Sequence, residues 1–216
     1  MRYLNGYKIF ESKQDIDSIC AKYKIINYTI NQNGLIDVDG GVDLSNLDLD
    51  RLPIKFGNVT SHFNCCENNL IDLEGCPEEV GGNFYCGYNK LETLEYVPDR
   101  INRSFYCSRN NLKSLEGCPT FIGGAINCND NQLYSLEHFP KHIGDHFMCR
   151  GNPIHSLVKN FVRKSNACNL VELFNDADIV QGDKVIWDRL LWFYEEVDVR
   201  LVSNTEEIES YYKIIK

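Results

Sequence analysis

Apolar residues recur through the middle of this chain at a constant interval of 21 residues. One position of the repeat is held by Leu70, Leu91, Leu112, Leu133 and Ile154, and a leucine follows three residues after each. The repeated unit reads F-x-C-x-x-N-x-L-x-x-L-E-x-C-P-x-x-I-G-G, and five copies follow it closely. Such repetition predicts a solenoid, in which each unit forms one coil and the stacked coils share a core.

Each unit is expected to contain a short strand, because Phe84 and Cys86 alternate with outward positions. Equivalent strands of neighbouring coils would lie about 4.8 Å apart in a parallel sheet. A proline in the second half of four units disfavours a long helix, so extended or 3₁₀ segments are expected there. These prolines are Pro77, Pro98, Pro119 and Pro140.

An asparagine occupies one inward position of every unit. A side-chain amide can bond backbone groups of its own coil and of the neighbouring coil, so a buried asparagine is satisfied in each repeat. We expect these residues to form a structural ladder, called the asparagine ladder below. It consists of Asn68, Asn89, Asn110, Asn131 and Asn152.

A cysteine column admits two interpretations. Cysteine is a small residue that is commonly buried, so it suits the interior of a narrow coil. Alternatively, stacked thiolates could hold a metal or form a redox site. Packing is favoured because no cationic neighbours are present to lower the thiol pKa, and we expect neither metal nor cofactor. The column consists of Cys65, Cys86, Cys107, Cys128 and Cys149.

Residues 1–41 are expected to form an N-terminal cap. Ser12 to Tyr23 has the pattern of a helix, and Asn33-Gly34 lies between alternating residues, as in a β-hairpin. Asp37, Asp39 and Asp43 could suggest a calcium site, but their spacing is not that of an EF-hand, so a solvated turn is favoured.

The repeats occupy residues 42–157, and residues 158–216 differ from them in pattern. Helices are expected at about 158–175, 183–197 and 204–215, which would give a helical C-terminal cap. The middle helix has apolar residues around much of its girth, Trp187 and Leu191 among them. Such a helix is either buried in its own cap or meets a partner.

The composition narrows the possible partners. The formal net charge is -9 and no run of basic residues occurs, so nucleic acid is an unfavourable partner. No segment approaches the roughly 20 apolar residues that span a membrane, and the first residues lack the apolar region of a signal peptide. These features predict a cytoplasmic protein with no membrane association.

The units "GGNFYC" and "SLEGCP" resemble those of the short leucine-rich-repeat proteins that bacteriophages and some bacteria commonly encode. The resemblance covers residues 42–157. It implies a curved solenoid with a parallel β-sheet on its concave face. Together with the N-terminal cap of helix and hairpin and the helical C-terminal cap, the expected fold is an α/β solenoid. The resemblance also implies an interaction role, in the host cytoplasm if the protein is phage-encoded, but no particular target. Catalytic effector ligases with such repeats are not matched, since Cys168 lacks their accompanying motif.

Aromatic and basic residues gather at the outward strand positions, where partners of such solenoids usually dock. This composition is typical of an interface core, although parallel tyrosines could simply stabilise the sheet. The predicted partner-binding residues are Tyr85, Tyr88, Tyr106, Arg109, Met148 and Arg150.

Three function classes follow from these patterns. A protein-protein interaction module is favoured, and a structural or virion-associated assembly protein is the alternative. An enzyme or a metal or redox protein ranks third, since the five histidines occupy different repeat positions apart from His62 and His146. No catalytic residue is assigned.

Overall fold

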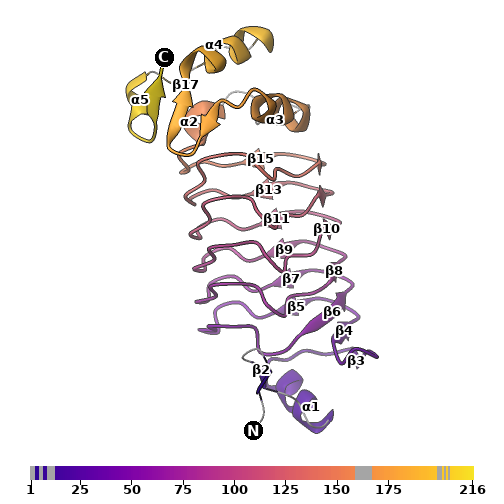
Figure 1. Cartoon of the computed structure of the whole chain (residues 1–216). Helices are drawn as coiled ribbons and strands as arrows, with labels where there is room; N and C mark the ends of the chain where they lie inside the picture. The colour runs from indigo at the N-terminus through magenta and orange to yellow at the C-terminus, as the bar shows by residue number, and fades with distance from the viewer. Residues whose placement is uncertain are drawn as a thin grey trace.

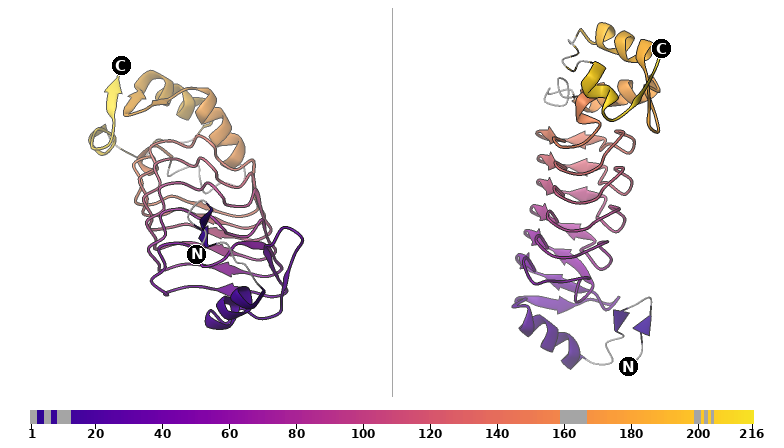
Figure 2. Two further views of the ribbon diagram at one scale, coloured as in Figure 1. Left: turned by 60° about the horizontal axis from the view of Figure 1, so that its bottom comes forward. Right: turned by 90° about the vertical axis from the view of Figure 1, so that its left-hand side faces the viewer.

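The computed structural model describes residues 3–4, 7–8, 13–158, 167–198, 201, 203 and 205–216. The repeats form a parallel β-solenoid of about five turns, with small helical segments at both ends. Its coils stack as a column with little bend, so the predicted concavity of the strand face is slight (Figures 1 and 2).

Each coil contributes strands to two parallel sheets. Sheet 1 has six strands, β5 (Val42–Asp43), β7 (Phe63–Asn64), β9 (Phe84–Tyr85), β11 (Phe105–Tyr106), β13 (Ile126–Asn127) and β15 (Phe147–Met148). Sheet 2 has seven strands, β3 (Tyr28–Ile30), β4 (Ile36–Val38), β6 (Phe56–Val59), β8 (Glu79–Val80), β10 (Arg100–Ile101), β12 (Phe121–Ile122) and β14 (His142–Ile143). The sequence predicted only sheet 1 and left the segments after the prolines as extended or 3₁₀; they are extended and pair with one another.

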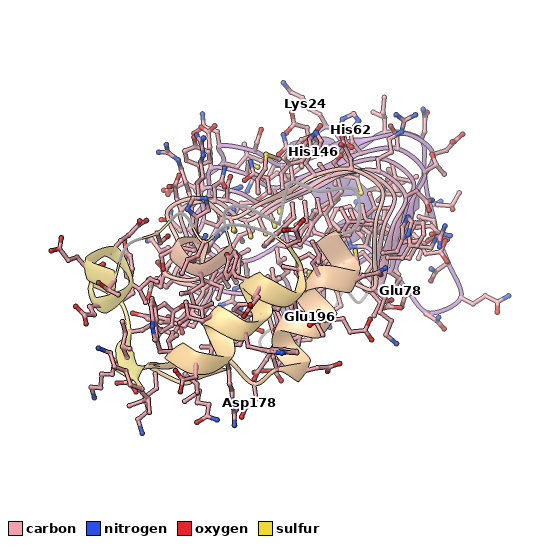
Figure 3. All side chains as sticks on the ribbon, turned by 90° about the horizontal axis from the view of Figure 1, so that it is seen from above. Lys24, His62, Glu78, His146, Asp178 and Glu196 are labelled. Atoms are coloured by element: carbon pink, nitrogen blue, oxygen red, sulfur yellow. The ribbon has the colours of Figure 1, made fainter. Side chains whose placement is uncertain are left out.

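The 21-residue interval is the hydrogen-bonding register of sheet 1. Phe105 pairs with Phe84 on one side and with Ile126 on the other, so equivalent positions lie beside one another. Seen down the axis, His62 and His146 project to the same side of the column although four coils separate them (Figure 3). Every repeat position therefore becomes a column of side chains along the solenoid.

A tight corner joins the two sheets within each coil. Between β8 and β9 it consists of Gly81, Gly82 and Asn83. A Cβ on Gly144, at the same corner of the fifth coil, would lie 2.0 Å from the carbonyl oxygen of Gly123. Glycine at this position therefore permits the close approach of neighbouring coils.

The phenylalanines form the centre of the core. Phe63 and Phe84 pack edge to face with 5.4 Å between ring centroids, and Phe105 continues the row at 5.6 Å. All three side chains are fully buried. Each ring is covered by the rings of the neighbouring coils, so a single coil could not bury its phenylalanine and would not fold alone.

The N-terminal cap contains α1 (Lys13–Lys22), with Ile16 and Cys20 buried against the first coil. The predicted N-cap residue, Ser12, lies outside the described residues. The predicted hairpin is present as β3 and β4, which pair antiparallel around Gly34 at φ +77°. A second small hairpin precedes α1, formed by β1 (Tyr3–Leu4) and β2 (Tyr7–Lys8).

The C-terminal cap is less helical than the sequence predicted. α2 (His155–Val158) ends the last repeat, and the cap contains α3 (Ala167–Asp176), α4 (Trp187–Glu196) and α5 (Thr205–Glu209). It also contains a three-stranded sheet of β16 (Val180–Gln181), β17 (Lys184–Ile186) and β18 (Lys213–Ile215). The prediction of helices at 183–197 and 204–215 was therefore wrong at one end of each range, because residues 184–186 and 213–215 form strands. There the β-branched residues pair as strands, with Val185 beside Ile214. Residues 159–166 of the first expected helix lie outside the described part of the chain.

Candidate protein-binding surface

Two tyrosines of sheet 1 form a stacked pair on its outer face. The rings of Tyr85 and Tyr106 lie 4.8 Å apart between centroids and are inclined by only 7°. The hydroxyl of Tyr85 also accepts a hydrogen bond of 2.7 Å from the side-chain amide of Asn83. Both tyrosines are half-buried, so part of the stacked pair remains accessible to a partner.

Tyr88 and Arg109 lie at the corner that follows sheet 1. The guanidinium carbon of Arg109 lies 4.9 Å from the ring centroid of Tyr88, a cation–π contact. Its Nε is 3.5 Å from the Asp130 carboxylate of the next coil. Tyr88, Arg109 and Asp130 thus form a chain of contacts across three coils, beside the tyrosine pair.

The backbone at this corner has a left-handed conformation in every coil. The φ angle is +56° at both Tyr88 and Arg109, and +57° at Glu67. A left-handed conformation costs roughly 1–2 kcal/mol for a residue with a Cβ, and glycine adopts it most easily. Only Gly151, in the last coil, is a glycine at this position. Asn46 and Asp130 at the same position are the sequence signal of this conformation, since asparagine and aspartate adopt it more readily than other residues with a Cβ.

Met148 and Arg150 lie apart from the other predicted residues. Both belong to the fifth coil, and Asn127 and Asn129 of the fourth coil separate them from Tyr106 and its neighbours. The backbone amide of Arg150 donates to the Asn129 side chain over 2.7 Å. The structure therefore brings Tyr85, Tyr88, Tyr106 and Arg109 into one group and leaves Met148 and Arg150 about two coils away.

The asparagine ladder lies inside the corner next to this surface. The Nδ2 of Asn110 donates to the carbonyl oxygens of Cys107 in its own coil and Cys86 in the preceding coil, each over 3.1 Å. Its Oδ1 accepts from the backbone amide of Leu91 over 3.0 Å. The other four asparagines make equivalent bonds, and all five are buried. These bonds link neighbouring coils and satisfy the backbone of the strained corner.

The cysteine column lies in the core as free thiols. Burial raises the pKa of the Cys86 and Cys128 thiols well above the usual range, and nearby thiols add to the effect. The pKa of Cys107 rises to about 12 for the same reason, loss of solvation. A raised pKa opposes the thiolate that metal binding or redox chemistry requires.

The histidines and acidic residues of the described part of the chain are spread over several coils. The histidines His62 and His146 share a column but contact separate partners, Ser61 and Asp145. In the part of the chain that the structure describes, no group of three or more His, Cys, Asp or Glu side chains is placed to hold a metal ion. The predicted solvated turn was wrong for Asp37 and Asp43, which lie in β4 and β5 and accept hydrogen bonds from Asn58 and Asn64 of the next coil.

Sheet 2 carries a stack that the sequence analysis missed. The guanidinium carbon of Arg100 lies 3.7 Å from the ring centroid of Phe121. The other face of that ring stacks on His142, with centroids 4.5 Å apart and planes inclined by 10°. The 21-residue register aligns these three residues in the sequence, so the column could have been found had a second strand been expected in each coil.

The C-terminal cap exposes two apolar residues of α4. Leu191 is 44% exposed and Trp192 is 47% exposed, whereas Leu190, Phe193 and Tyr194 are buried. Trp187, which the sequence placed on a second apolar side, packs partly against the core. The helix is therefore buried along one face only.

None of the described helices has the length and hydropathy needed to cross a membrane. In comparisons with known proteins, no family model matches this chain, and no curated protein sequence is significantly similar to it.

Proposed function

We propose that this protein is a protein-binding module whose partner docks on the outer face of sheet 1. The resemblance of its repeats to phage-encoded repeat proteins supports a host protein as the partner and the host cytoplasm as the location. Tyr85, Tyr88, Tyr106 and Arg109 form the centre of the surface, and Met148 and Arg150 extend it toward the cap.

The observation that carries this proposal is the residue types at the left-handed corner: three other coils have Asn46, Asp130 and Gly151 there, which adopt this conformation readily, whereas two coils have Tyr88 and Arg109. Glycine would relieve the strain at either position, yet the chain has a bulky aromatic and a guanidinium group there. Strained residues cluster at functional sites because the side chain is needed for something other than stability. The contacts of Arg109 with Tyr88 and Asp130 offset part of the backbone strain. The side chains of Tyr88 and Arg109 nevertheless remain exposed.

The chemistry of the group also favours protein binding. Tyrosine and arginine contribute large contact areas and are enriched among residues that dominate binding energy. The stacked tyrosine pair has little rotamer freedom left to lose, which lowers the entropic cost of association.

Glycine substitution separates function from stability at this corner. Arg109→Gly removes the side chain and relaxes the backbone, so the melting temperature should be unchanged or higher while partner binding is lost. Asn46→Gly is the matched control, because it changes the same left-handed corner three coils before Arg109, away from the tyrosine group. Binding is measured by pulldown from a host lysate, followed by titration of the captured protein. Retention of the partner by Arg109→Gly and by Tyr106→Ala at full affinity would contradict the proposal.

An assembly role is the second candidate, and exposed Leu191 and Trp192 on α4 are the observation that favours it. In that case the double variant Leu191→Ser, Trp192→Ser should abolish higher-order species in sedimentation velocity. The Arg109→Gly variant should leave them unchanged.

A further inference from the structure

Sheet 2 presents a cationic side chain whose position is fixed before any partner arrives. The Nε of Arg100 donates to the Asn102 side chain over 3.0 Å, and the guanidinium lies on the face of Phe121. His142 supports the opposite face of the same ring. The three residues occupy equivalent outward positions of successive coils, as the pairing of β10, β12 and β14 requires.

The guanidinium does not use the carboxylate nearest to it in the sheet. Pairing of Ile101 with Val80 places Arg100 beside Glu79, yet within the described residues neither side chain forms an ion pair. The side chain instead lies toward Phe121, and its two Nη groups have no further partner in the described part of the chain. An arginine held in this way can donate two parallel hydrogen bonds to a carboxylate with little additional loss of entropy.

The charges around the stack change from acidic to basic toward its C-terminal end. Glu78 precedes β8, whereas Lys141 holds the equivalent position before β14, and both are exposed. Arg103, in the corner after β10, is also exposed. The carboxylate of Asp99 is already occupied, because it accepts two hydrogen bonds from Thr120. Electrostatic complementarity therefore favours an anionic partner at the β10–β14 end of this face.

We propose that Arg100, Phe121 and His142 form a second recognition surface, which binds an acidic peptide segment of a partner protein. One carboxylate of the segment is held by the Nη groups of Arg100, and further carboxylates lie along the column toward His142 and Lys141. This surface is separate from the tyrosine group, since the corner of residues 102–104 lies between Arg100 in sheet 2 and Tyr106 in sheet 1.

The test uses a fluorescein-labelled peptide of ten glutamates and fluorescence anisotropy at low salt. The wild-type protein should bind it saturably, and Arg100→Gln should weaken binding by about tenfold or more, the loss typical of a dominant interface residue. Phe121→Leu should also weaken binding, because the guanidinium loses the surface that fixes it. Arg100→Lys should bind less well than wild type, since an ammonium neither stacks as a plane nor donates in parallel.

Two matched variants distinguish recognition from general electrostatic attraction. Lys113→Gln removes one positive charge from an exposed position outside both sheets and should leave the peptide affinity unchanged. Glu79→Gln should raise the affinity, because a carboxylate that repels the acidic peptide beside Arg100 is removed. Thermal melting of each variant checks that the fold is retained.

Absence of saturable peptide binding, or equal affinity in wild type and Arg100→Gln, would overturn the proposal. Equally tight competition by a ten-residue oligothymidylate, lost in Arg100→Gln, would assign the surface to nucleic acid and overturn it as well.

Discussion

The side-chain amide of Asn110 donates to the carbonyl oxygen of Cys86, one coil earlier, over 3.1 Å. The same side chain bonds its own coil and the backbone amide of Leu91, so a single residue connects two coils at three points. A buried amide with all its bonds made is stabilising, but the same groups are costly once unpaired. The stacking of coils therefore depends on the asparagine ladder as well as on the phenylalanine row.

Replacement of Asn110 by alanine is expected to lower the free energy of unfolding by about 1–3 kcal/mol, because three buried backbone groups lose their partner. Urea denaturation followed by circular dichroism measures the change. Asn111→Ala is the control, and it should stay within about 0.5 kcal/mol of wild type, since that side chain is not part of the ladder. Equal midpoints for the two variants would mean that the ladder contributes nothing to stability.

Thiol labelling of the native protein should discriminate sharply among the cysteines. Cys86, Cys107 and Cys128 are buried, so a maleimide at neutral pH should leave them unmodified until the protein unfolds. Cys168 is partly exposed and should react first. Mass spectrometry of digested samples gives the order. Dialysis against a chelator should not shift the melting temperature, and either prompt modification of Cys107 or such a shift would favour a thiolate site.

Stability should decrease at alkaline pH. Burial raises the pKa of Cys107 from 9.0 to about 12, so the thiol stays neutral in the native state while it ionises in the unfolded chain. Below pH 9 the thiol is protonated in both the native and the unfolded state, so its contribution to stability does not change with pH there. Between pH 9 and 12 only the unfolded state ionises, and the free energy of unfolding decreases by about 1.4 kcal/mol per pH unit for each such thiol. Cys107→Ala should show a shallower decline in the free energy of unfolding over that range, and a slope identical to wild type would contradict this account.

The cap should be attached to the solenoid partly through Tyr194, whose buried hydroxyl donates to the carbonyl oxygen of Leu157. Burial raises the pKa of Tyr194, as expected of a hydroxyl without access to water. Tyr194→Phe should cost about 0.5–1.5 kcal/mol and increase amide hydrogen exchange around α2 and the fifth coil. Tyr211→Phe is a suitable control because Tyr211 is exposed. Exchange that changes equally in both variants would show that the bond does not hold the cap.

The sequence by itself determined the parts of this protein that follow from periodicity. A constant interval of 21 residues can place Phe84, Phe105 and Ile126 side by side only in stacked coils, and an inward asparagine in each coil must bond the backbone around it. The hairpin at Asn33-Gly34 was also predictable, because its turn chemistry is local.

The tertiary structure decided what depends on contacts between coils and on the course of the backbone. The second sheet forms because segments such as Glu79–Val80 pair with their neighbours, although two residues are too few to read as a strand. The left-handed backbone at Tyr88 and Arg109 could not be predicted from these two residues, because tyrosine and arginine rarely adopt that conformation. The sequences of β17 and β18 are compatible with either a helix or a strand. They form strands because they pair with each other, although almost 30 residues separate them. For the same reason the stack of Arg100, Phe121 and His142 became visible only once sheet 2 had placed the three residues on one face.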